Sequence, residues 1–237
     1  MKKIKMLVSY GLYMILFRIR GFKYKLLKSR ATEEEVIKYR DKVIQNWAAF
    51  TVKTLDLKIQ VVGRENIPSE ACVFIGNHQS LLDIPILLYG TQRSVGFIAK
   101  KELLKVPVIG YWMRLIHCVP IDRENVREAI KVINIGSDNL LNGNDMAIFP
   151  EGTRAREGVM KDFKKGSMKL ATKAKAPIVP VTIDGSYKAY ELNNKFQSAE
   201  VKITFGEPIY TNNLTKEEEK DLHIRVQNVV KGNLQVK

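Results

Sequence analysis

The sequence has few of the residues that cross-link a small protein or hold a metal. It contains only two cysteines, Cys72 and Cys118, and three histidines among 237 residues. No CxxC pair or Cys/His cluster occurs, which argues against a structural zinc site. Both cysteines lie in apolar, strand-like runs, so we expect two buried thiols in a reducing cytosol. A chain of this length can bury a large core without disulfides or metals.

The sequence also lacks a long apolar run near its amino terminus. The charge-free stretch there covers residues 6–17 and would reach about 18 Å as a helix. The hydrocarbon core of a bilayer is about 30 Å thick, so a transmembrane span is not expected. A basic start and an apolar centre also fit a secretory signal peptide. Residues 18–30, however, are basic and offer no clear cleavage site, so we expect no cleaved signal peptide.

Acidic residues are few in two parts of the chain. The whole sequence has 39 basic and 25 acidic residues, a formal net charge of +14. Residues 1–32 hold nine basic residues and no acid, and residues 154–175 hold eight basic and two acidic residues. The remainder is close to neutral. This localised excess argues against a uniformly basic nucleic-acid-binding surface and favours two contact zones for anionic partners.

The amino-terminal 57 residues predict two helices that precede the globular body. The first has apolar and aromatic residues flanked by cations, which is typical of a helix lying in a membrane interface. Thr32 and Glu35 have the spacing of a capping box at the start of the second. We therefore expect residues 1–57 to be a membrane-docking segment and residues 58–237 to be an α/β domain. The alternative is that both helices simply pack on the core.

After residue 57, short apolar runs alternate with helical stretches. Such alternation predicts an α/β sheet covered by helices on both faces. Ligands in such sheets bind beyond the carboxyl ends of the strands, where the polar motifs of this sequence also fall. The expected strands are residues 58–62, 72–76, 95–99, 118–121, 146–149, 178–183 and 201–205.

The first polar motif is NHQSLLD at residues 77–83. His78 and Asp83 would point about 140° apart on one helix, so they can meet only if His78 precedes a helix that begins near Asp83. Gly76 can end the strand and Pro85 suits an early helical position. An aspartate on one imidazole nitrogen would fix the tautomer and let the other nitrogen deprotonate a hydroxyl. A purely structural His/Asp pair is the alternative.

The second polar motif is FPEGTR at residues 149–154. Its proline and glycine force a turn, and Arg154 offers a planar fork for a phosphate. Glu151 could orient a hydroxyl or anchor Arg123, which ends the expected strand VPIDR. Lys100 follows another strand and could add a phosphate contact. A plain turn with a surface salt bridge and a solvated lysine are the alternatives.

Together, NHQSLLD, VPIDR, FPEGTR and the apolar strand IVPVTI resemble the signature motifs of the glycerolipid acyltransferases, in particular the bacterial 1-acylglycerol-3-phosphate acyltransferases. The resemblance covers about residues 70–210. It implies the αβ acyltransferase fold, with a mixed central sheet covered by helices. It also implies that His78 is the general base and Asp83 its partner. The expected substrate-binding residues are Asn77, Ser80, Lys100, Arg123, Glu151, Gly152, Thr153 and Arg154.

The resemblance further implies a reaction. A fatty acyl chain would move from an acyl thioester to the free hydroxyl of lysophosphatidic acid, with no metal or cofactor. The donor would be acyl-ACP or acyl-CoA, and the enzyme would sit on the cytoplasmic face of the membrane as a monotopic protein. Backbone amides near residues 76–79 or at Gly152 are candidates for stabilising the oxyanion.

One basic feature is left outside these motifs. Four lysines repeat at every fourth position and would share one helical face, where an anionic donor could bind or water could solvate them. They are Lys161, Lys165, Lys169 and Lys173.

Two other functions remain open at this point. The protein could be a member of the same family that acts on another lyso-lipid. It could instead be a non-catalytic basic protein that binds membranes or nucleic acid, although RNP-like aromatic motifs are absent.

Overall fold

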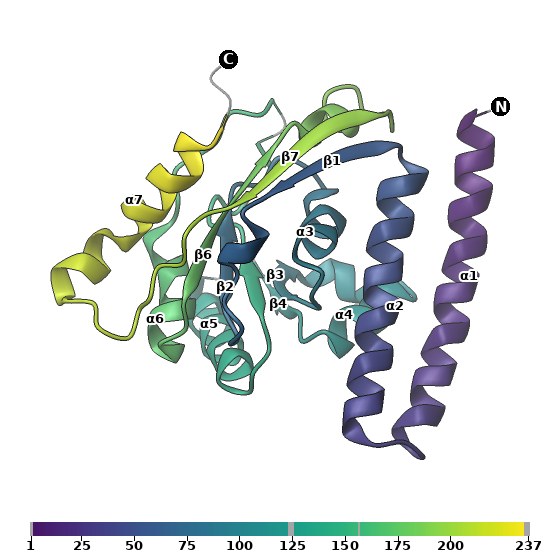
Figure 1. The fold of residues 1–237 in the computed structure, drawn as a ribbon, viewed down its shortest axis with the longest axis horizontal. Coiled ribbons are helices and arrows are strands. Elements are labelled where there is room, and N and C mark those ends of the chain that lie inside the picture. Colours follow the sequence, from purple (N-terminus) through teal and green to yellow (C-terminus); the bar gives the residue numbers. More distant parts are fainter. Residues whose placement is uncertain (1, 123–125, 156, 235–237) are drawn as a thin grey trace.

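The computed structural model describes residues 2–122, 126–155 and 157–234. Two long helices, α1 (Lys2–Lys28) and α2 (Glu33–Thr54), stand side by side at one end of the molecule (Figure 1). The predicted capping box is confirmed at the start of α2. The Thr32 side chain accepts from the Glu35 backbone N–H, and Oε2 of Glu35 accepts from the Thr32 N–H at 2.9 Å.

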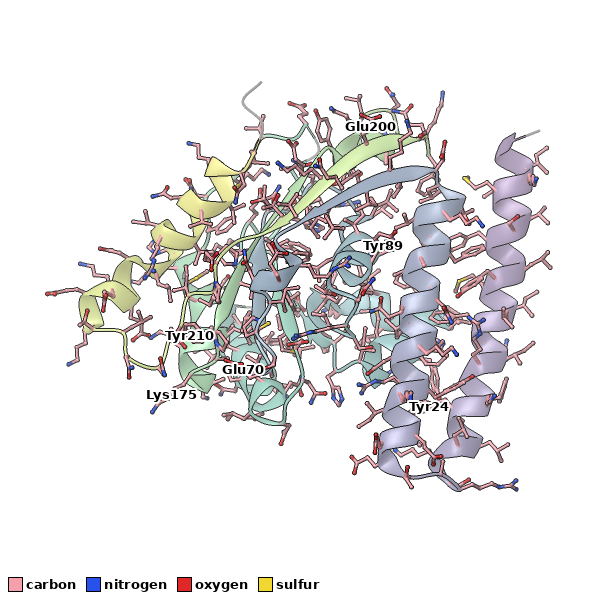
Figure 2. All side chains as sticks on the ribbon, viewed as in Figure 1. Tyr24, Glu70, Tyr89, Lys175, Glu200 and Tyr210 are labelled. Atoms are coloured by element: carbon pink, nitrogen blue, oxygen red, sulfur yellow. The ribbon has the colours of Figure 1, made fainter. Side chains whose placement is uncertain are left out.

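An aromatic cluster joins the helix pair to the body. Phe17 of α1 is 1% exposed and its ring stacks on Trp112 at 4.9 Å between centroids. The Trp112 indole N–H also donates to the Phe17 carbonyl at 3.1 Å. Tyr24, labelled in Figure 2, also belongs to α1. Its ring meets that of Trp112 edge-on, with 6.1 Å between centroids. One face of α1 is therefore part of the core, as expected if the helix packs on the body.

The seven expected strands are confirmed, with ends within two residues of those predicted. They form one sheet in the order β1-β7-β6-β2-β5-β3-β4. Neighbouring pairs are parallel except for β6 and β7, so the sheet is mixed, as expected. The strands are β1 (Leu57–Val62), β2 (Val73–Gly76), β3 (Gly96–Lys100), β4 (Val119–Ile121), β5 (Met146–Ile148), β6 (Ile178–Asp184) and β7 (Ala199–Phe205).

Helices cover both faces of the sheet (Figure 1). On one face, a buried cluster that includes Phe74 and Phe97 packs with α2, α3 (Asp83–Thr91) and α4 (Ile109–Leu115). On the other face, Ile75 and Ile148 pack with α5, α6 and α7. The bounds of these helices are Val126–Leu141, Lys169–Ala174 and Lys216–Gly232. Alternating side chains of the central strands thus face two separate cores, because successive residues in a strand point to opposite faces.

The prediction that the four spaced lysines share one helical face is wrong. Lys161 lies outside any helix, and Lys165 begins a short 3₁₀ turn. Only Lys169 and Lys173 belong to α6. The physical reason lies in Glu151, whose Oε2 accepts from the Lys161 backbone N–H at 2.8 Å and so ties this segment to the turn after β5.

Among the described residues, no helix combines the length and apolar content needed to cross a membrane.

Candidate active site

The polar motifs meet at one edge of the sheet. Strands β2 to β6 all run parallel within the sheet, so their carboxyl ends share that edge. His78 follows β2, Glu151 follows β5 and Ser186 follows β6. This convergence of loops is the usual location for a ligand site in an α/β sheet.

The loop between β2 and α3 wraps around the Asp83 carboxylate. Oδ2 of Asp83 lies 2.7 Å from Nδ1 of His78 and also accepts from the backbone N–H groups of Gln79 at 2.7 Å and Ser80 at 2.8 Å. The Ser186 hydroxyl donates to Oδ1 at 2.6 Å. Asp83 is fully buried at the start of α3. The predicted arrangement, with His78 before the helix and Asp83 in its first turn, is confirmed.

The imidazole of His78 is fixed on a second side by an aromatic ring. Phe149 stacks on it with 4.3 Å between centroids and 10° between planes. Because Nδ1 faces Asp83, Nε2 is the ring nitrogen left for a substrate. The His78 side chain is 12% exposed and lines a cavity. A held imidazole with one open nitrogen at a cavity wall is equipped for general-base catalysis.

Glu151 holds the loop of His78 in place. Its Oε1 accepts from the His78 backbone N–H at 2.6 Å, while Oε2 binds the Lys161 N–H. Burial raises the pKa of Glu151 above its usual value, and the two N–H donors oppose that rise. The Ala155 N–H also donates to the His78 carbonyl at 2.7 Å. Both carboxylate oxygens of Glu151 are thus engaged by the backbone, which gives this residue a positioning role.

Asn77 and Ser80 also hold the loop. Both are buried and neither lines the cavity beside His78. The Asn77 side chain pairs with the backbone of Ile183 in both directions, at 2.8 and 2.9 Å. The Ser80 hydroxyl oxygen accepts from the Leu82 N–H at 3.1 Å. The structure therefore places these two expected substrate ligands outside the cavity wall. Asn77 joins the end of β2 to β6, and Ser80 holds the turn that precedes α3.

Arg154 points to the cavity and is paired with an acid that no motif indicated. Its Nη1 lies 2.9 Å from Oε1 of Glu191. Glu191 and Ser186 were both missed because each lies more than 100 residues from its partner loop. Ser186 had one usable signal, its place just after a predicted strand. Glu191 had none.

The cavity beside His78 has a volume of about 610 Å³. Most of its wall is apolar and comes from the helix pair, α3, β3 and α4 as well as from the loops. Lys100, Thr153 and Arg154 supply its polar rim. The apolar wall includes Tyr10, Phe17, Ile44, Trp47, Leu88, Phe97, Ile109, Trp112 and Met113.

A larger cavity of about 880 Å³ lies on the side of α5 and α6. Gly152 lines this second cavity and not the first, and Phe149 lines both. The φ angle of Gly152 is +72°, and a Cβ there would come within 2.9 Å of the Lys164 ammonium. Gly152 therefore contributes its backbone conformation, which a side chain at this position would disfavour. Arg123, expected to bind phosphate, lies outside the described residues.

Three of the backbone amides that were candidates for stabilising the oxyanion already donate hydrogen bonds within the protein. The N–H of His78 is taken by Glu151, that of Gln79 by Asp83, and that of Gly152 by the Phe149 carbonyl at 3.1 Å. The expectation was wrong for these three amides because they hold the loops instead.

Comparisons with known proteins agree with this arrangement. The acyltransferase family model matches residues 58–184. The chain is 31% identical over 204 residues to the chloroplastic 1-acyl-sn-glycerol-3-phosphate acyltransferase of Brassica napus, covering 84% of this chain and 58% of the relative. It is 35% identical over 144 residues to the 1-acyl-sn-glycerol-3-phosphate acyltransferase of Pseudomonas aeruginosa, covering 59% of this chain and 56% of that relative. The chain spans about half the length of the curated relatives it matches.

A solved structure is similar over almost the whole chain. The crystal structure of the 1-acyl-sn-glycerophosphate acyltransferase from Thermotoga maritima superposes with a TM-score of 0.84 at 30% identity. The match covers 98% of this chain and 95% of that chain, so it includes the helix pair as well as the sheet.

Proposed function

This chain belongs to the acyltransferase family, and from that premise we propose that it moves a fatty acyl chain from an acyl thioester to the free hydroxyl of lysophosphatidic acid. The product would be phosphatidic acid. The observation that carries the proposal is the 2.7 Å contact between His78 and buried Asp83 at the wall of an apolar cavity that also presents Arg154. The names of the relatives support the same acceptor.

His78 acts as the general base. Nε2 takes the proton of the acceptor hydroxyl as that oxygen attacks the thioester carbonyl carbon. Asp83 stabilises the imidazolium that results, because it is buried beside Nδ1. The C–S bond then breaks, and the leaving thiolate recovers the proton from His78. The reaction is balanced without an enzyme nucleophile.

The acceptor phosphate binds to the cations at the rim of the cavity. Arg154 and Lys100 both line it, and a guanidinium forms paired hydrogen bonds with phosphate oxygens. The sequence adds Arg123 to this set as an expectation. Thr153 is exposed at the same rim and offers a hydroxyl to the head group.

The outer face of α1 would seat the enzyme on a membrane. Apolar side chains there repeat every three or four residues and are half or more exposed, while the opposite face packs on the body. Lysines and arginines flank them, as in helices that bind anionic lipid surfaces. The exposed apolar residues are Ile4, Leu7, Val8, Leu12, Ile15, Ile19, Phe22 and Leu26. The cavity walls formed by α1 then lie close to the lipid from which the acceptor comes.

The acyl donor would be acyl-ACP or acyl-CoA, both of which are anionic. The second cavity supports this choice because Lys164, Lys169 and Lys173 line it. Glu219 also lines it and pairs with Lys169 at 2.6 Å, so the positive charge is partly offset.

The direct test is thiol release from acyl-ACP and from acyl-CoA in the presence of lysophosphatidic acid, with phosphatidic acid measured as product. His78→Ala should lower the rate by roughly 10²–10⁴ because it removes the base, while its thermal unfolding stays cooperative. Asp138→Asn, an exposed change on α5, serves as the control. Transfer to lysophosphatidylcholine at an equal rate would point to another acceptor. Near-normal turnover by the histidine variant would contradict the mechanism.

A further inference from the structure

Glu191 is a buried acid that joins two parts of the site. It lies in the connection between β6 and β7, and its side chain is 2% exposed. Oε1 accepts from the Leu81 backbone N–H at 2.8 Å and from Nη1 of Arg154 at 2.9 Å. One oxygen therefore fixes both the loop of His78 and the guanidinium at the cavity rim.

The other oxygen of this carboxylate is unused. Oε2 of Glu191 is buried and has no hydrogen-bond partner among the described residues. An unpaired buried carboxylate oxygen is costly and calls for a reason. A guanidinium can give two parallel hydrogen bonds to one carboxylate, so Oε2 can take a second N–H from Arg154. The ion pair can then persist while Arg154 turns toward a ligand.

We propose that Glu191 is the positioning residue for Arg154, setting where the acceptor phosphate binds relative to His78. This inference rests on the proposed function. The side chain of Arg154 is 33% exposed and has several rotatable bonds, so without a partner it would sample many positions. Held by Glu191, it keeps its remaining N–H groups at the cavity rim. Because Leu81 shares the same oxygen, the guanidinium and the loop of His78 move together.

The geometry predicts a specific kinetic effect. Losing Glu191 should weaken recognition of the phosphate, because Arg154 is no longer directed. It should affect the chemical step much less, because His78 is held separately by Asp83, Glu151 and Phe149. Loss of a residue needed only for folding would not raise the KM for the acceptor while leaving the KM for the acyl thioester unchanged.

The test compares Glu191→Ala and Glu191→Gln in steady-state thiol release. The alanine variant should raise the KM for lysophosphatidic acid at least about tenfold, with the KM for the acyl thioester and kcat within about twofold. The glutamine variant keeps an acceptor oxygen for Leu81 and Arg154, so its acceptor KM should stay within about threefold of the native value. Glu200→Ala, an exposed glutamate on β7, is the matched control.

Three results would overturn the proposal. One is an equal rise in both KM values, another is a fall in kcat with the acceptor KM unchanged, and the third is a glutamine variant as impaired as the alanine one. If the alanine variant does not fold, Glu191→Asp replaces it. Aspartate keeps the charge but is one methylene too short to reach both partners, so the same selective rise in acceptor KM is expected. Failure of the proposed function itself is distinguishable, because the native protein would then release no thiol with lysophosphatidic acid.

Discussion

The hydroxyl of Ser186 donates a 2.6 Å hydrogen bond to Oδ1 of Asp83, on the side of the carboxylate away from His78. Both residues are fully buried. The two oxygens of the carboxylate are therefore held by segments that follow different strands. Oδ2 is bound by the loop after β2, and Oδ1 is bound by the turn after β6. Asp83 cannot rotate without breaking one of these contacts, which makes Ser186 a positioning residue for the pair of His78 and Asp83.

Replacing Ser186 with alanine should slow catalysis without changing substrate affinity. The variant leaves a buried carboxylate oxygen without its donor, and a hydrogen bond to a charged group is worth about 1.5–3 kcal/mol. We expect kcat to fall about tenfold, equivalent to roughly 1.4 kcal/mol of lost orientation, with both KM values unchanged.

The matched control for this variant is Ser137→Ala. Ser137 is equally buried and donates to the Leu170 carbonyl at 3.1 Å, but it lies on α5, in the core of the other face of the sheet. It should lower stability with kcat unaffected. Equal losses of kcat in the two variants would show that the Ser186 effect is only structural.

Charging the outer face of α1 should weaken membrane binding while leaving the fold intact. Leu12 is 63% exposed, so Leu12→Glu disturbs little packing, yet it places an anion where we expect lipid contact. Sedimentation with vesicles containing anionic lipid should show a clear loss of bound protein. Leu141→Glu on α5, where the native side chain is 68% exposed, should bind as the native protein does. Equal binding by both variants would contradict docking through α1.

His117 should make a contribution to stability that is lost below neutral pH. Burial lowers the pKa of His117 below its ordinary value of 6.5, and the charge of Arg40 acts in the same direction. From pH 6.5 downward the unfolded chain therefore binds a proton that the folded chain resists. By linkage, the free energy of unfolding decreases as the pH falls through this range.

His117→Asn should reduce that pH dependence. The φ angle of His117 is +60°, a conformation that asparagine tolerates well, so the change should add little backbone strain. Urea unfolding at pH 7.5 and pH 5.5 should show a smaller loss of stability in the variant than in the native protein. Identical losses would mean that His117 makes no contribution to acid sensitivity.

The sequence by itself determined the local elements and the pairing of His78 with Asp83. Short continuous apolar runs placed all seven strands within two residues, since a strand buried on both faces is apolar at successive positions. The capping spacing of Thr32 and Glu35 located the start of α2. The five-residue spacing of His78 and Asp83 permitted one geometry only, because a continuous helix would have separated them.

Tertiary structure alone decided which side chains support that pair. Ser186 and Glu191 come from the connection between β6 and β7, and no local pattern records a contact made across more than 100 residues. Tertiary structure also engages the side chains of Asn77 and Ser80 with the backbone, where the sequence had suggested substrate contacts. It binds the Lys161 N–H to Glu151, so the expected lysine helix does not form there. Each of these outcomes depends on which backbone donors and acceptors become buried together. That is fixed by how the strands are ordered in the sheet, not by spacing along the chain.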